Sequence, residues 1–157
     1  MKKYELTDDT ITVGGRILHR IKALKSFSDV EEGDLGGYVE KEDNLDHSGE
    51  AWVSGDARVY GNARVYGNAR VSGDARVSGD ARVSGENDYA AAKGFGREYR
   101  TTTFFRLQDG GIGVRCGCFC GTLEEFREKV KETHKESKMG KEYLMLADLM
   151  EYKFKNA

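Results

Sequence analysis

Three cysteines stand at alternate positions in the C-terminal third of the chain, at Cys116, Cys118 and Cys120. Thiolates and imidazoles are common zinc ligands, so His134 would complete a four-ligand set with them. The spacing opposes this, because residues two apart on a strand lie about 6.6 Å apart, whereas thiolates on one zinc ion lie about 3.8 Å apart. Parallel side chains on one strand also exclude a disulfide. We therefore expect buried thiols packed against helices, with a zinc site as the alternative.

Basic and aromatic side chains recur at a fixed spacing in the middle of the chain. Arginine binds phosphate and carboxylate groups through two parallel hydrogen bonds. An arginine pair beside a tyrosine would therefore bind a small anionic ligand or a partner protein. The alternative is a solvated, charge-balanced surface, because acidic residues alternate with the basic ones. The candidate binding residues are Arg58, Tyr60, Arg64, Tyr66, Arg70, Arg76 and Arg82.

These residues belong to six consecutive six-residue units between Gly49 and Gly85. Each unit has glycine first, alanine third and valine fifth, and each unit after the first has arginine fourth. Residues two apart on a strand share a face, so alanine and valine point inward and arginine points outward. Glycine and the aspartate or asparagine beside it turn the chain. With three units per coil, the stacked pairs are Arg58 with Arg76 and Arg64 with Arg82, while Arg70 lies on the third face.

The repeat resembles the left-handed parallel β-helix of hexapeptide-repeat proteins. The segment before it, from Ile21 and Ala23 through Tyr38 to Trp52 and Val53, resembles the lead-in of the YdcK-like, polymer-forming branch of these proteins. This resemblance, over about residues 17–85, implies that residues 1–48 pack as strands on the first coil. It also implies trimers, because prisms of this family commonly pack in threes. Two coils need such caps or partners, since they bury too little to fold alone.

The N-terminal segment is expected to form the first cap. Short strands at residues 4–6 and 10–13, followed by the turn residues Gly14 and Gly15, predict a hairpin. Val39 and Leu45 stand six residues apart and predict an irregular first coil. The step from Leu45 to Val53 is two residues too long, so we expect an insertion near residues 46–49.

The C-terminal segment predicts a second kind of module. Residues 87–100 break the repeat and are expected to form a connector. A strand at 101–106, a turn at Asp109 and Gly110, and a return strand at 112–119 predict a hairpin. Thr122 and Glu125 form a capping box that begins a helix ending near 134–137, and a second helix covers about 140–154. This ββαα arrangement resembles a tail seen in phage and mobile-element proteins of unknown role.

Composition limits the class of partner and the cellular compartment that we expect for this chain. The chain has 157 residues, a formal net charge of −2 and a pI of about 6.0, which makes a nucleic-acid partner unlikely on bulk charge. No run approaches the ~20 apolar residues of a membrane span. The first residues lack the apolar centre of a signal peptide, so a cytoplasmic protein is expected. The sequence contains no phosphate-binding loop, HExxH or Ser-His-Asp pattern, and no cofactor is predicted.

The predicted fold is mainly β with a small α+β tail. A short left-handed parallel β-helix at residues 49–86 is capped by N-terminal strands at 1–48 and, after the connector at 87–100, by the ββαα module at 101–157. The predicted function is a non-enzymatic binding or scaffold protein that forms homo-oligomers and binds a host protein or a small anion. The tail resemblance sharpens this into a phage-encoded inhibitor of a host defence factor, either a protein or a nucleotide signal.

Two alternatives stay open. Hexapeptide-repeat acyltransferases use a histidine that projects between subunits, and this resemblance implies CoA-dependent acyl transfer as the enzymatic alternative. His47 is the best-placed histidine, because it lies in the irregular stretch beside the first coil. The second alternative is a zinc-binding interaction module built from the cysteine cluster and His134.

Overall fold

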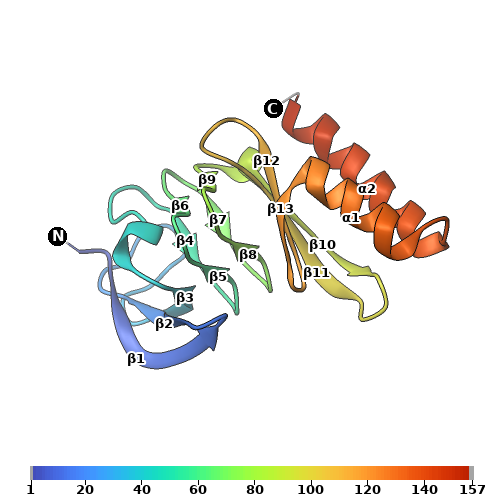
Figure 1. Ribbon diagram of the computed structural model, residues 1–157. Helices are drawn as coiled ribbons and strands as arrows, with labels where there is room; N and C mark the ends of the chain where they lie inside the picture. The colour runs from blue at the N-terminus through green and yellow to red at the C-terminus, as the bar shows by residue number, and fades with distance from the viewer. Residues whose placement is uncertain (1, 156–157) are drawn as a thin grey trace. The chain divides into compact units, whose positions relative to one another are not determined.

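The computed structural model describes residues 2–155, which form two compact units divided between Glu86 and Asn87 (Figure 1). The first unit holds strands β1 to β9, and the second holds strands β10 to β13 followed by helices α1 and α2. The protein is therefore mainly β with two C-terminal helices, as the sequence predicts at that level. Among the described residues, no helix is both long and apolar enough to cross a membrane.

The repeat forms six two-residue strands, and each of the first three pairs in parallel with the strand eighteen residues further along. We name three ladders: the first joins β4 and β7, the second joins β3, β5 and β8, and the third joins β6 and β9. Valine lies opposite valine in each, and all repeat valines and alanines are buried, which confirms the predicted inward face. The strands are β4 (Trp52–Val53), β5 (Arg58–Val59), β6 (Arg64–Val65), β7 (Arg70–Val71), β8 (Arg76–Val77) and β9 (Arg82–Val83).

The N-terminal segment is a hairpin that joins the second ladder through β3 (Leu35–Val39). The hairpin consists of β1 (Tyr4–Val13) and β2 (Arg16–Ala23), joined at Gly14 and Gly15, whose positive φ angles of 54° and 81° suit a tight two-residue turn. The predicted turn is confirmed. The two predicted short strands are one long strand, because the chain absorbs Asp8 and Asp9 in a bulge between Leu6 and Thr10.

The register locates the predicted insertion. Val39 pairs with Val59 and Leu45 bridges to Val65, both over twenty residues, whereas Val53 pairs with Val71 over eighteen. The two extra residues therefore lie between Leu45 and Val53, as predicted. Both Val39 and Leu45 are fully buried, so an irregular coil does precede the regular repeat.

Two side chains donate hydrogen bonds to backbone carbonyl groups at the N-terminal end of the repeat. The amide Nδ2 of Asn44 donates to the carbonyl oxygens of Gly61 and Ala63, at 3.2 and 2.9 Å. The ammonium of Lys3 donates to the carbonyl oxygen of Ala51 at 2.6 Å. Carbonyl groups at the end of a solenoid have no next coil to bond to, and a buried carbonyl without a donor is costly. These two side chains therefore take the place of a preceding coil.

The second unit is a four-stranded antiparallel sheet with two helices, and it corrects two predictions. The strands are β10 (Tyr89–Phe95), β11 (Arg100–Arg106), β12 (Ile112–Cys116) and β13 (Phe119–Thr122). The predicted connector at 87–100 is wrong, because residues 89–95 pair with β11 along its Thr-rich and aromatic edge. This pairing overrides the weak strand preference of the alanines, so the module is ββββαα rather than ββαα.

The second correction concerns the return strand. It was predicted over residues 112–119, but β12 ends at Cys116, and the chain reverses through Gly117 and Cys118 so that Cys116 lies opposite Phe119. Gly117 has a φ of +57°, which glycine adopts without strain. The predicted turn at Asp109 and Gly110 is confirmed, since it joins β11 to β12.

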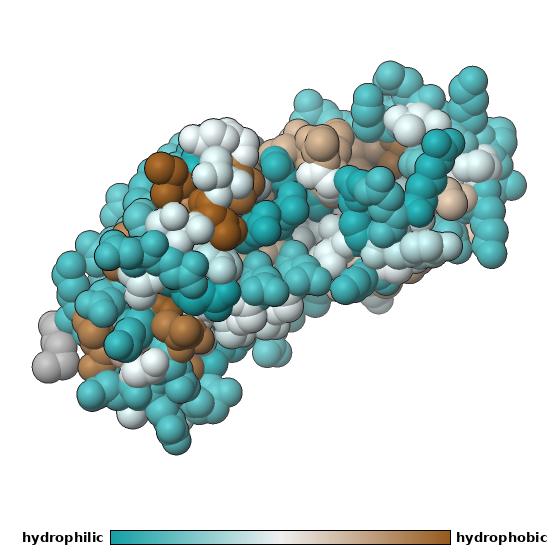
Figure 2. Space-filling view, turned by 90° about the horizontal axis from the view of Figure 1, so that it is seen from below, coloured by the Kyte–Doolittle hydropathy of each residue, from teal (hydrophilic) through white to brown (hydrophobic). Residues whose placement is uncertain are grey.

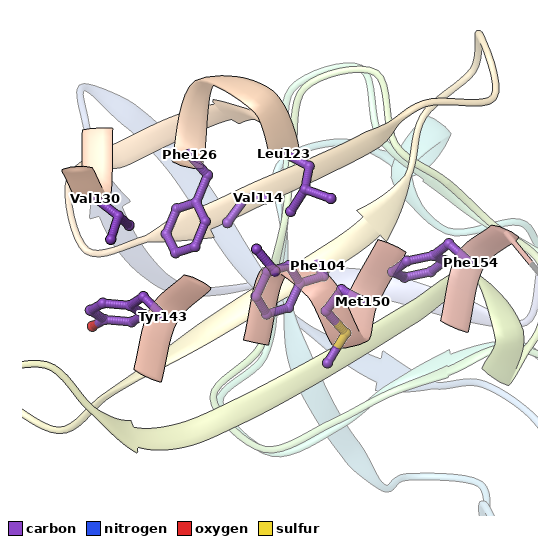
Figure 3. Close-up of a cluster of buried hydrophobic side chains, with 9 residues drawn as sticks. Phe104, Val114, Leu123, Phe126, Val130, Tyr143, Met150 and Phe154 are labelled. Atoms are coloured by element: carbon purple, nitrogen blue, oxygen red, sulfur yellow. The ribbon is translucent and has the colours of Figure 1, made fainter. Parts of the chain in front are cut away.

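The helices follow the predicted pattern closely. Helix α1 (Leu123–His134) begins with the predicted capping box, in which the Glu125 N–H donates to the Thr122 hydroxyl at 3.2 Å and the Thr122 N–H donates to the Glu125 carboxylate at 2.9 Å. Helix α2 (Lys138–Lys155) begins two residues earlier than predicted. The core of this unit lies between sheet and helices (Figure 3) and consists of Phe104, Val114, Leu123, Phe126, Val130, Tyr143, Ala147, Met150 and Phe154.

Candidate functional site

The structure distributes the predicted binding arginines over three ladders rather than one site. Arg70 lies opposite Trp52 on the first ladder, and its guanidinium forms an ion pair with Asp29 at 2.7 Å. Arg58 and Arg76 lie opposite each other on the second ladder, and Arg64 and Arg82 do so on the third. The predicted stacking is confirmed, but these five side chains do not converge on a single ligand.

Tyr60 is not available for contact. Only 5% of its surface is exposed, because it packs with Val13, Leu18 and Tyr38 beneath the N-terminal hairpin. The hairpin thus uses Tyr60 as a core residue of the cap. The sequence pattern gives Tyr60 and Tyr66 the same position in the repeat, and only the hairpin distinguishes them.

The remaining candidates meet in one groove on the third ladder. Arg64, Tyr66 and Arg82 line a hollow of about 460 Å³ together with residues of the irregular coil. Those further residues, which the sequence reasoning did not assign to a binding site apart from His47, are Glu42, Asp43, Leu45, Asp46 and His47, with Val65 at the floor. The two-residue insertion before Val53 was the signal that this side of the first coil is irregular. We call this hollow the third-ladder groove.

Hydrogen bonds fix the wall of the groove to its floor. The wall is the short 3₁₀ helix η1 (Glu42–Asn44). The Asn44 side chain holds it in place by donating to the carbonyl oxygens of Gly61 and Ala63, just before β6. The Asp46 N–H donates to the Val65 carbonyl at 2.9 Å, and the buried Leu45 bridges to Val65. The backbone that carries the groove residues is therefore held on both sides.

His47 has both ring nitrogens engaged. The Lys3 backbone N–H donates to Nδ1 at 3.0 Å, so the proton of a neutral ring resides on Nε2. Nε2 then donates to the Glu42 carboxylate at 3.2 Å, and the ring stacks on Tyr4 with the centroids 4.2 Å apart. No lone pair of this tautomer points into the groove.

Two of the carboxylates in the groove, Glu42 and Asp46, are stabilised in their ionised form. A hydrogen bond from the Lys2 ammonium, together with the one from His47, lowers the pKa of Glu42 against the effect of partial burial. Burial alone would raise the pKa of Asp46, but hydrogen bonds from the Ser48 N–H and hydroxyl lower it overall. The groove therefore carries negative as well as positive charge at neutral pH.

Three side chains in the groove are available to a partner. Within residues 2–155, the side chains of Arg64, Asp43 and Tyr66 make no hydrogen bond or ion pair, and Tyr66 is 38% exposed. Arg82 is turned back along the surface, since its guanidinium donates to the carbonyl oxygens of Asn62 and Ala81 at 2.8 and 2.9 Å. The groove thus offers one guanidinium, one carboxylate and one phenol.

The cysteine cluster does not assemble as a metal site. Cys116 is half-buried, while Cys118 lies in the turn and Cys120 on the next strand, both exposed. The expectation of three buried thiols is therefore wrong for two of them, because the chain reverses where a straight strand was predicted. Among the described residues, no group of three or more His, Cys, Asp or Glu side chains is arranged to hold a metal ion.

One comparison with known proteins matches this chain. A family model described as YdcK beta solenoid repeat matches residues 51–67 and 63–77, which lie within the parallel ladders described above. No curated protein matches the chain. Residues 51–77 are thus a β-solenoid repeat, and the similarity of the tail at residues 101–157 to phage proteins stays a prediction.

Proposed function

Taking residues 51–77 as a β-solenoid repeat, we propose that this chain is a non-enzymatic binding or scaffold protein whose third-ladder groove binds an extended segment of a partner protein. One observation carries the proposal: three of the predicted binding residues, Arg64, Tyr66 and Arg82, line a single groove with an apolar floor. An acidic side chain of the partner pairs with Arg64, a basic one pairs with Asp43, and an apolar one packs on Tyr66.

The charges favour a protein segment over a small anion. Two guanidiniums face three carboxylates in this groove, and the pKa values of Glu42 and Asp46 are lowered, so both repel a compact anion. A segment with charges of both signs, spaced along an extended backbone, meets each groove charge separately. This also supplies specificity, because a segment with the wrong order of charges is repelled.

The geometry of His47 supports a non-catalytic role. An acyltransferase needs this ring as a general base, with a lone pair directed at the substrate. The Nδ1 lone pair instead accepts the Lys3 N–H, and Nε2–H donates to Glu42. In the proposal His47 is a structural residue that ties the N-terminus to the irregular coil.

Self-association is assigned to α2 in this proposal. The view in Figure 2 shows a mostly hydrophilic surface with separate apolar patches. Met145, Leu149 and Tyr152 are 68, 56 and 70% exposed and form a stripe on the helix face opposite the buried one. Glu142 and Lys153 flank one side of the stripe at opposite ends, so an antiparallel pair of α2 helices brings Glu142 of one copy near Lys153 of its partner.

Three finer predictions accompany the proposal: the left-handed sense of the solenoid, the trimer, and the host defence factor as the partner. The first two rest on the hexapeptide-repeat resemblance and the third on the tail resemblance. The antiparallel α2 pair offers a dimer as the competing assembly.

The test is a selection of displayed peptides on the immobilised full chain. We expect the selected segments to share an acidic residue next to an apolar one, and Arg64→Glu to weaken their binding at least tenfold. The matched control is Arg58→Glu, which reverses the same charge one ladder away. If the selected peptides bind Arg64→Glu as well as the wild type, or lose affinity equally with Arg58→Glu, the groove is not the binding site.

A further inference from the structure

The second unit contains a hollow of its own, with a volume of about 540 Å³. It lies among the β10–β11 turn, the end of β12, the start of β13, the C-terminal half of α1 and Tyr143 of α2. Its walls are apolar and include Phe95, Phe119, Phe126 and Val130. Sites for small molecules typically measure about 300–1,000 Å³ and combine such walls with a few polar groups. We call this hollow the helix–sheet cavity.

The cavity lies at one end of the hydrophobic core. Figure 3 shows Tyr143 beside Val130 and Phe126, with Phe154 at the opposite end of the cluster. The rings of Phe126 and Tyr143 meet edge to face with centroids 5.6 Å apart, and Phe119 meets Phe126 at 5.7 Å. The aromatic walls are therefore packed against one another and present fixed surfaces.

Two hydrogen bonds connect polar side chains of the sheet to Tyr143. The Thr102 hydroxyl donates to the sulfur of Cys116 at 3.3 Å, and the Cys116 thiol donates to the Tyr143 hydroxyl at 3.8 Å. Burial, and then the neighbouring thiol, raise the pKa of Tyr143. The backbone at Gly96 lies so close to the Tyr143 hydroxyl that a side chain there would collide with it. The Tyr143 hydroxyl is therefore held between Cys116 and Gly96, and the His134 ring lies beside Tyr143 with the ring centroids 5.5 Å apart.

The rim of the cavity is basic. It carries Arg97, Arg100 and Lys129, against the single acid Glu98, which pairs with Arg100. Arg97 makes no hydrogen bond or ion pair with the rest of the described chain. Lys129 is only loosely paired, 3.9 Å from Glu132. One guanidinium is therefore unpartnered, beside an aromatic interior.

We propose that the helix–sheet cavity binds a small organic anion with an aromatic or branched apolar body. The body packs against Phe119, Phe126 and Tyr143, and the carboxylate, sulfonate or phosphate group meets Arg97 and Lys129 at the rim. Edge and face contacts with the rings favour a planar body, and the fork of a guanidinium favours an oxyanion. This site is independent of the third-ladder groove, and its failure would leave the proposed function untouched.

The experiment uses 8-anilinonaphthalene-1-sulfonate, an aromatic anion whose fluorescence rises in apolar sites. We expect saturable binding of one dye per full-length chain, measured by fluorescence titration. In a Cys118→Ser, Cys120→Ser background, Cys116 is the one remaining thiol. Bound dye is expected to slow its alkylation by iodoacetamide at least tenfold at saturation, because the thiol lines the same cavity.

Two variants connect the binding to the rim and to the interior. Arg97→Glu is expected to weaken dye affinity about tenfold, whereas Lys155→Glu, a matched reversal at an exposed position of α2 outside the cavity lining, leaves it unchanged. Thr133→Trp changes an exposed helix residue at the cavity and is expected to block the dye while circular dichroism stays that of the wild type.

Three outcomes would overturn the proposal. The first is dye binding that does not saturate, and the second is alkylation of Cys116 that proceeds at the same rate with and without dye. The third is an equal loss of affinity in Arg97→Glu and Lys155→Glu, because that would indicate attraction by overall charge rather than by the rim.

Discussion

The ammonium of Lys3 lies 2.6 Å from the carbonyl oxygen of Ala51, with the lysine side chain fully buried. One coil later, the equivalent carbonyl of Ala69 accepts the backbone N–H of Trp52 at 3.0 Å. Lys3 thus occupies the position that a backbone donor of a preceding coil would hold. The Phe27 ring, 5.1 Å from Nζ, covers the charge on another side. At Ala51, beside the first ladder, the repeat therefore ends on a side chain rather than on a further strand.

We predict that Lys3→Met lowers the free energy of unfolding by about 1–3 kcal/mol, because it leaves the buried Ala51 carbonyl without its donor. Urea denaturation of the full chain measures this change. Lys2→Met is the matched control, since Lys2 is exposed and its ion pair with Glu42 contributes less than about 1 kcal/mol. Equal effects of the two substitutions would contradict a capping role for Lys3.

Burial lowers the pKa of Lys3 to about 8, and this predicts a pH dependence of stability. Below pH 8 the amine is protonated in both states, and the folded state bears the cost of the buried charge. Between pH 8 and about 10 the folded chain releases the proton while the unfolded chain keeps it, so stability rises with pH. Above pH 10 the effect reverses in part, because burial raises the pKa of Tyr4 and the folded tyrosine keeps its proton.

The measurement is the free energy of unfolding at pH 7.5, 8.5 and 9.5 for the wild type and Lys3→Met. We expect the difference between the two proteins to grow with pH, by at most about 1.4 kcal/mol per pH unit. A constant difference across this range would show that Lys3 has an ordinary pKa in the folded protein.

Glycine at the start of each repeat unit serves two purposes, which a pair of substitutions can separate. Gly49 and Gly79 have φ angles of +74° and +63°, so alanine at either position is strained by about 1–2 kcal/mol. A Cβ at Gly49 would also lie 2.7 Å from the carbonyl oxygen of Gly67 in the next coil, whereas one at Gly79 meets nothing within 4 Å. We predict that Gly49→Ala lowers the melting temperature clearly more than Gly79→Ala does.

The contrary result would also be informative. If both substitutions lower the melting temperature equally, the coils can separate slightly at Gly49, and backbone strain alone explains the glycines.

The exposed apolar stripe on α2, formed by Met145, Leu149 and Tyr152, predicts how copies of this chain associate. Leu149→Lys places a charge in the middle of the exposed apolar face and is expected to convert a self-associating protein to monomers in sedimentation velocity. Glu142→Lys is expected to weaken association, and the charge swap Glu142→Lys with Lys153→Glu to restore it, because the proposed antiparallel pair would bring these positions together. Association that is unchanged in Leu149→Lys would place the contact elsewhere.

The sequence by itself determined the regular part of the first unit. The six-residue period fixes which face of each strand is buried, and with three units per coil it also predicts the valine ladders and the opposition of Arg58 and Arg76. The eight-residue step from Leu45 to Val53 likewise locates the insertion. In the second unit, the capping box at Thr122 and Glu125 is a local signal, and it was predicted correctly for the same reason.

Only the tertiary structure decided which of the equivalent repeat positions face solvent and how the repeat ends. Tyr60 and Tyr66 are identical in the pattern, yet the N-terminal hairpin buries the first and leaves the second in the groove. Lys3 reaches Ala51 across 48 residues, and no local pattern marks a lysine that will donate to a distant carbonyl. In the second unit, an alanine-rich segment became strand β10, because its pairing with β11 and the packing of Ala90 and Phe95 against the core outweigh a weak strand preference.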